Sequence, residues 1–173
     1  MSVSAYALLV GAWSLLRVAE LLLSEVNTGP LLGRGAHEVG APHHVWLLLM
    51  NAAVPMASVA EVALRNLTFP GLLGWVALLV LVLAEILHWW AIATLWRRWT
   101  TRVLVLPGER AASAGPYRWL HHPGYVGGVV SAVALPMVHG AVGAALLTVA
   151  MFAPVVTVRV RAENSAWARW GAS

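Results

Sequence analysis

The stretch GLLGWVALLVLVLAEILHWWAIATLW, residues 71–96, decides the fold of this chain, because it is apolar over a length typical of a membrane-spanning helix. An α-helix rises about 1.5 Å per residue, so about 20 apolar residues cross the roughly 30 Å hydrocarbon core of a bilayer. Tryptophan gathers toward its end, as in the aromatic belts of membrane proteins, at Trp89, Trp90, Trp96 and Trp99. The stretch predicts a transmembrane helix.

Four further apolar stretches extend this prediction to the whole chain. With 60% hydrophobic and 10% charged residues, the 173 residues have too little polar surface for a water-soluble globule. We expect an all-α, polytopic membrane bundle of about five transmembrane helices in a single domain, residues 1–173, with a C-terminal helical hairpin that turns at His139-Gly140. The remaining predicted spans are residues 5–23, 45–64, 125–138 and 141–158.

The first span carries Arg17 and Glu20 and is not preceded by a basic segment, so we expect a retained helix and not a cleaved signal peptide. Three positions apart, these two side chains share one helix face. Two interpretations remain open: an intrahelical ion pair near the membrane interface, or a pair that faces a functional site.

The polar segments between the spans are predicted to be loops. Residues 24–42 contain several Gly and Pro residues, which makes the segment too broken for a long helix. Residues 97–124 form the main hydrophilic loop, in which residues 103–106 could be a short extended piece. Because the chain has no room for a separate soluble catalytic domain, any cofactor must bind the bundle or these loops.

The composition disfavours several classes of function. The chain has no Cys, which excludes disulfides, thiolate catalysis and Cys-ligated metals. Its net charge of +4 comes without a basic run interleaved with aromatic residues, so no nucleic acid is expected as a partner. Glu85 and His88 form one Glu-x-x-His pair, whereas a di-metal bundle needs two such pairs and further carboxylates. No metal site is therefore predicted.

The chemistry is predicted to lie in GPYRWLHHPGYVGG, residues 115–128, a polar and ring-rich run between two apolar stretches. Its Gly-Pro and Pro-Gly pairs indicate turns, because Pro fixes φ and Gly accepts a positive φ. We therefore expect a stiff loop that leads into a helix starting near Tyr125, whose first amide groups could hold a carboxylate.

Within this run, Gly115-Pro116-Tyr117-Arg118 and His122-Pro123-x-Tyr125-x-Gly127 resemble the signature loop of the isoprenylcysteine carboxyl methyltransferase family, integral membrane enzymes that use S-adenosylmethionine. The chain has His121 where the family usually has Arg. The resemblance implies that S-adenosylmethionine is the cofactor. It implies contacts to this cofactor from Gly115, Pro116, Tyr117, His122, Pro123, Tyr125 and Gly127.

Arg159 and Glu163, four positions apart after the last span, match the Arg and Glu that serve the active site in this family. The resemblance implies that both are catalytic, Arg159 by holding an anionic acceptor and Glu163 also by binding the cofactor. Asn164 stands where many members have a second Glu. Interpretations without a role in catalysis stay open. Tyr117 and Tyr125 could be aromatic residues at the membrane interface, His122 could cap the loop, and Arg159 could determine the topology.

The N-terminal half resembles the bacterial branch of the family found beside type III polyketide synthases. The residues that carry this resemblance are Arg17-x-x-Glu20, Ser24, Asn27 and Arg34-Gly35-Ala36-x-Glu38-x-Gly40-x-x-His43. It implies O-methylation of a lipophilic alkylpyrone or alkylresorcinol, whereas the signature loop implies a prenylcysteine-type carboxylate. Two other classes remain open: a non-catalytic membrane scaffold, and a small transporter with a proton path through Glu20, Glu61, Glu85 and His88.

Arginine is distributed unevenly between the two ends of the predicted bundle. Five spans place nine Arg residues on one side and only Arg65 on the other. By the positive-inside rule, the signature loop and the C-terminus are expected in the cytoplasm and the N-terminus outside, in a bacterial plasma membrane whose lipids surround the bundle. The nine are Arg34, Arg97, Arg98, Arg102, Arg110, Arg118, Arg159, Arg161 and Arg169.

Overall fold

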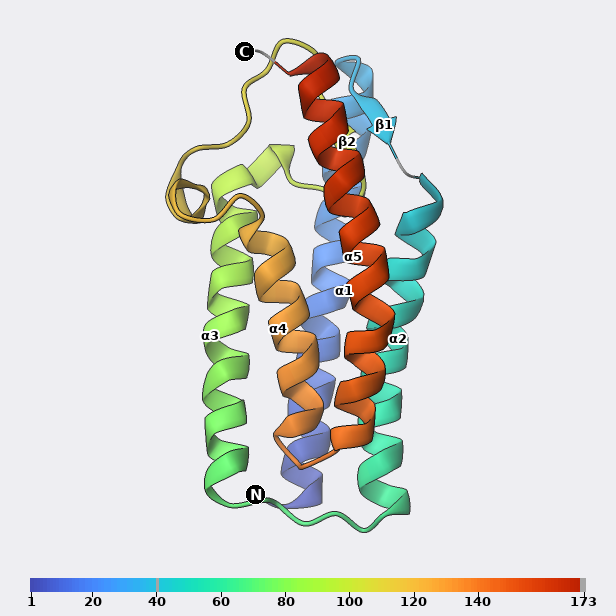
Figure 1. Cartoon of the computed structure of the whole chain (residues 1–173), viewed down its shortest axis with the longest axis vertical. Coiled ribbons are helices and arrows are strands. Elements are labelled where there is room, and N and C mark those ends of the chain that lie inside the picture. The colour runs from blue at the N-terminus through green and yellow to red at the C-terminus, as the bar shows by residue number, and fades with distance from the viewer. Residues whose placement is uncertain (40, 172–173) are drawn as a thin grey trace.

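The computed structural model describes the backbone of residues 1–39 and 41–171, and the side chains of residues 1–39 and 45–171. In these residues five α-helices run up and down beside one another, and a long loop, residues 96–122, joins α3 to α4 (Figure 1). Their bounds are α1 Val3–Gly33, α2 Ala41–Leu64, α3 Leu72–Leu95, α4 Pro123–Met137 and α5 Val142–Trp170. One buried apolar core receives side chains from all five helices.

Four of the five helices are long and apolar enough to cross a membrane. They also expose large apolar side chains, such as Leu8 at 76% and Leu72 at 77%, as expected where lipid is the solvent. The fifth helix, α4, has 15 residues and is shorter than a typical span. The structure therefore confirms a polytopic helical bundle with the predicted turn at His139-Gly140, and gives four long spans with α4 packed among them.

The prediction of a loop over residues 24–42 was wrong for its first part, because α1 continues to Gly33 through Gly29 and Pro30. Only three residues follow Pro30 in the helix, so the hydrogen bond that proline removes lies in the last turn and costs little. Ser24 and Asn27 are buried and make contacts with a distant segment, described below, which hold this part of the helix. Tertiary contacts have overridden weak local propensity.

A small two-stranded antiparallel sheet lies at the end of the bundle where the C-terminus is also found (Figure 1). β1, His37–Val39, pairs with β2, Val103–Val105, with Glu38 opposite Leu104. The extended piece expected at residues 103–106 is thus confirmed, while β1 was not predicted. Gly40, His43 and His44 lie outside the residues whose side chains are described.

Helices α3 and α4 are in backbone contact at Gly127. A Cβ atom there would lie 2.8 Å from the carbonyl oxygen of Ala84 and 2.8 Å from the amide nitrogen of His88, so only Gly fits. This contact sets the position of α4, the helix that the signature loop enters.

At the opposite end of the bundle, Glu61 of α2 accepts hydrogen bonds from the amides of Gly143 at 3.1 Å and Ala144 at 2.6 Å, in the first turn of α5. A carboxylate there satisfies amides that have no partner within the helix and interacts favourably with the helix dipole. Glu61 also pairs with Arg65 at 2.7 Å. It therefore joins α2 to α5 and lies apart from Glu20, Glu85 and His88, with which it was grouped as a possible proton path.

Candidate active site

A cavity of about 350 Å³ opens among the helices on the side of the loops and the C-terminal helix. This volume falls in the range of about 300 to 1,000 Å³ of small-molecule sites. Its lining is charged and aromatic at the loops, and between the helices it combines apolar side chains with the polar Arg17, Glu20, Asn51 and His88. The apolar part includes Leu47 of α2, Val129 of α4, and Phe152 and Val156 of α5.

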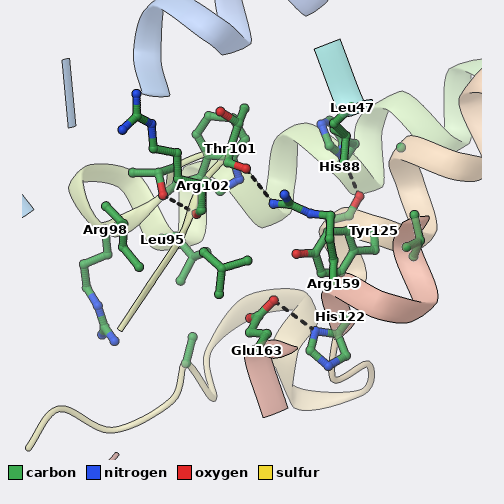
Figure 2. A pocket seen from close by; sticks show the side chains of 18 of the residues that line it. Leu47, His88, Leu95, Arg98, Thr101, Arg102, His122, Tyr125, Arg159 and Glu163 are labelled. Atoms are coloured by element: carbon green, nitrogen blue, oxygen red, sulfur yellow. Dashed lines mark hydrogen bonds and ion pairs between the residues drawn. The ribbon is translucent and has the colours of Figure 1, made fainter. Parts of the chain in front are cut away.

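Arg159 of α5 lies in the wall of this cavity and is 3% exposed. Its Nη2 donates to the carbonyl oxygen of Thr101 at 2.6 Å, and its guanidinium carbon lies 5.8 Å from the centre of the Tyr125 ring (Figure 2). Its Nε is buried and has no hydrogen-bond partner in the described part of the chain. Among the residues that the structure describes, no carboxylate lies within the 4.0 Å of an ion pair with Arg159. A buried cation with an unused donor is suited to bind an anion.

The extension of α1 places the Thr101 carbonyl in front of Arg159. Ser24 accepts a hydrogen bond from the amide of Thr101 at 2.9 Å, and its hydroxyl lies 2.8 Å from the Thr101 hydroxyl. Asn27 donates to the carbonyl oxygens of Trp96 at 2.9 Å and Trp99 at 2.8 Å. The 3₁₀ turn Trp96–Arg98 and the residues after it are thereby held against α1.

One turn after Arg159, Glu163 faces the signature loop. Its Oε2 lies 3.8 Å from Nδ1 of His122, whose Nε2 lies 3.1 Å from the side-chain oxygen of Asn164 (Figure 2). The His122 ring also lies against that of Tyr125, with centroids 5.7 Å apart. His122 therefore joins the loop to the last helix at the mouth of the cavity.

Tyr117, in the 3₁₀ turn Gly115–Arg118, lines the same region. Burial raises the pKa of its phenol, and the negative charge of Glu163 raises this pKa further. The hydroxyl therefore keeps its proton at neutral pH and can donate a hydrogen bond to a ligand.

The predicted site residues divide into two groups. Tyr117, His122, Tyr125, Arg159 and Glu163 come together around the cavity. Gly115, Pro116, Pro123 and Gly127 instead shape the backbone: Gly115 has a φ of +54°, Pro116 is buried in the turn, Pro123 begins α4 two residues before the expected start, and Gly127 meets α3. Direct cofactor contacts from this second group stay a prediction.

Arg17 and Glu20 face the interior of the bundle. They form an intrahelical ion pair at 3.0 Å, as in the first interpretation, and both line the cavity together with His88 of α3, as in the second. Arg17 also pairs with Glu85 at 2.6 Å. No group of three or more His, Cys, Asp or Glu residues in the described part of the chain could hold a metal ion.

Two contributors to the site were missed by the sequence analysis. The Thr101 carbonyl is a backbone group, and no side-chain pattern marks it. Asn51 of α2 also lines the cavity; a lone amide within an apolar span was the available signal.

Comparisons with known proteins identify the family of the chain. A sequence model of the isoprenylcysteine carboxyl methyltransferase (ICMT) family matches residues 75–169, more than half of the chain. The chain is 29% identical over 160 residues to YpbQ of Bacillus subtilis, which is named as an uncharacterized protein. The alignment covers 92% of this chain and 94% of YpbQ. It is 23% identical over 152 residues to an uncharacterized protein of Haemophilus influenzae, covering 87% and 88% of the two chains. No solved structure matches.

The chain belongs to the isoprenylcysteine carboxyl methyltransferase family, a family of S-adenosylmethionine-dependent methyltransferases. The matched residues run from α3 into the last turns of α5, so they include the signature loop, Arg159 and Glu163.

Proposed function

We propose that this protein is a membrane methyltransferase that uses S-adenosylmethionine to methylate an oxygen of a lipophilic acceptor. The observation that carries the proposal is Arg159, a buried guanidinium that pairs with no carboxylate among the described residues, in the wall of a cavity with both polar and apolar side chains. Such a residue can hold an anionic oxygen while an apolar tail occupies the space between the helices.

The polar part of the cavity suits the cofactor. When bound, S-adenosylmethionine supplies an electrophilic methyl group on a sulfonium. Glu163 provides a carboxylate for the sulfonium or the ribose hydroxyls, and the rings of Tyr117 and Tyr125 provide faces that attract a cation. His122 keeps Glu163 near the loop through the 3.8 Å contact.

The chain's contribution to the reaction is mainly positioning. Arg159 stabilises the charged form of the attacking oxygen and orients it, because its planar fork can make two parallel hydrogen bonds. The apolar walls exclude water, which strengthens this charge–charge interaction. A bound S-adenosylmethionine would supply its methyl group to this oxygen, and the transfer would neutralise both the anionic oxygen and the sulfonium.

For the acceptor we favour a phenolic or enolic lipid of the alkylpyrone or alkylresorcinol type over a prenylcysteine-type carboxylate. The support is the resemblance of the N-terminal half, in which Ser24 and Asn27 hold the backbone that faces Arg159. Both acceptor types have an ionisable oxygen and a long apolar tail, and both suit the cavity.

We also propose that the loops at the C-terminal end of the bundle face the cytoplasm. In Figure 1 the loop of residues 96–122 and the C-terminus lie at one end, and the connection that carries Arg65 lies at the other. The excess of arginine at the first end supports this orientation, and it gives a cytosolic cofactor access to the polar part of the cavity.

Calorimetry on the detergent-solubilised protein tests the proposal. We expect binding of S-adenosylmethionine or S-adenosylhomocysteine, and transfer of a labelled methyl group to an alkylresorcinol in preference to a prenylcysteine. Absence of binding of either cofactor at millimolar concentration would remove the enzyme and leave the two other classes, a membrane scaffold and a small transporter. Transfer to the prenylcysteine alone would keep the enzyme and reverse the acceptor.

A further inference from the structure

Four ionisable side chains form a continuous chain inside the bundle, and we call them the buried quartet: Glu85, Arg17, Glu20 and His88. Arg17 of α1 donates to Glu85 of α3 at 2.6 Å and pairs with Glu20 at 3.0 Å. The other oxygen of Glu20 lies 2.7 Å from Nε2 of His88. Acidic and basic side chains thus alternate along this chain, which starts on α3, passes through two residues of α1 and returns to α3.

The hydrogen bonds of His88 define its charge. Its Nδ1 lies 2.7 Å from the carbonyl oxygen of Gly124, which can only accept. Its Nε2 faces Glu20, which also pairs with the guanidinium of Arg17. Against a carboxylate at Glu20 both ring nitrogens donate, and only the imidazolium has two donors. Two cations then balance two carboxylates, and a quartet without net charge avoids the high cost of an uncompensated charge in the bundle.

The quartet ends on the signature loop. Gly124 is the second residue of α4, between His122 and Tyr125 of the proposed cofactor site. The His88 ring lies directly under this first turn, because a Cβ atom on Gly128 would lie 3.4 Å from its Cε1. The side chain of His88 is 93% buried. Its contact with Gly124 is therefore largely shielded from solvent at the wall of the cavity, where a charged donor is stronger than in water.

We propose that the buried quartet is an anchor for the cofactor loop, in which His88 as an imidazolium is a positioning residue that holds the Gly124 carbonyl. The hydrogen bond fixes the first turn of α4 and so places His122 against Glu163 and Tyr125 against Arg159. The effect on cofactor binding rests on the function proposed above. The effect on the loop itself does not depend on it.

His88→Asn and His88→Gln form a matched pair for this test. Both remove the imidazolium and change the net charge of the quartet equally. The Asn amide replaces Nδ1 and can still donate to Gly124, whereas the Gln amide replaces Nε2 and can donate only to Glu20. The measurements are affinity for S-adenosylhomocysteine and hydrogen–deuterium exchange of residues 115–128 without any ligand.

We expect His88→Asn to keep affinity within about threefold of wild type, and His88→Gln to lose about 10- to 100-fold, the range for a hydrogen bond to a charged group. Exchange of residues 115–128 should be faster in His88→Gln alone. Equal behaviour of the two variants in exchange overturns the anchor. If the wild type does not bind the cofactor, the proposed function fails while the exchange measurement still decides on the anchor.

The balance of charge is tested by adding Glu85→Gln to His88→Asn, which returns the quartet to neutrality. The double variant should melt at a higher temperature than His88→Asn alone, and equal or lower melting overturns the neutral quartet. If neither His88 variant folds, Glu20→Gln replaces them, with Glu25→Gln as its control because Glu25 is exposed on the same helix. Faster exchange of residues 115–128 in Glu20→Gln but not in Glu25→Gln supports the anchor. Equal exchange in these two variants overturns it.

Discussion

Replacement of Arg159 by Lys separates the charge of this residue from its shape. The guanidinium already donates to Thr101 at 2.6 Å and has a further buried donor without a partner. A Lys ammonium keeps the charge but loses the planar fork, so it cannot keep the bond to Thr101 and also present the second, fixed donor to the acceptor oxygen. A lost hydrogen bond to a charged group costs about 1.5–3 kcal/mol. At about 1.4 kcal/mol per tenfold change, turnover should fall about 10- to 150-fold.

The assay for Arg159→Lys measures methyl transfer and cofactor affinity in the same preparation, each corrected for the folded fraction. Cofactor affinity should stay within about threefold of wild type, because the cofactor is assigned to Glu163 and the loop. Arg161→Lys is the matched control, since Arg161 is exposed on the same helix two residues away. We expect it to have wild-type turnover.

Two results would refute this assignment of Arg159. Equal losses of cofactor affinity and turnover would place Arg159 on the cofactor and not on the acceptor. Wild-type turnover with Lys would show that charge alone is sufficient, and that the single contact with Thr101 is the whole role of the fork.

Three further substitutions give distinct results. Glu163→Gln should weaken cofactor binding about 10-fold, with turnover at saturating cofactor close to wild type; a loss of turnover alone would contradict its role. Gly127→Ala should destabilise the bundle by about 1–3 kcal/mol, because its Cβ would lie 2.8 Å from the Ala84 carbonyl oxygen; an unchanged melting temperature would contradict the close contact. Ser113→Cys should react with an impermeant thiol reagent from the cytoplasmic side only, and labelling from outside would reverse the orientation.

The main helices could be predicted because their apolar runs have the length of a membrane span, and α3 is the clearest example. The extension of α1 could not. Gly29 and Pro30 indicate a break locally, and the contacts that keep the helix intact are made by Ser24 and Asn27 with residues about 70 positions away. Such contacts leave no periodicity in the sequence.

The residues of the candidate site, like the helices, could be predicted in part. The pattern of the signature loop and the spacing of Arg159 and Glu163 predicted five of the side chains that line the cavity. The partners of these side chains were not predictable, because the Thr101 carbonyl carries no side-chain signal. Likewise, the three-residue spacings of Arg17 with Glu20 and of Glu85 with His88 each indicated a shared face, but not that the two faces meet.

The two buried arginines of the bundle show how the same residue type can have opposite roles. Arg17 is paired with two carboxylates, Glu20 and Glu85, so its charge is balanced within the protein. Arg159 is as deeply buried, yet it contacts a backbone carbonyl and the face of Tyr125. An unbalanced cation at that depth is costly to the fold, and an anionic ligand lowers the cost when it binds. Arg17 therefore suits a structural anchor, and Arg159 suits a site whose charge is completed by the acceptor.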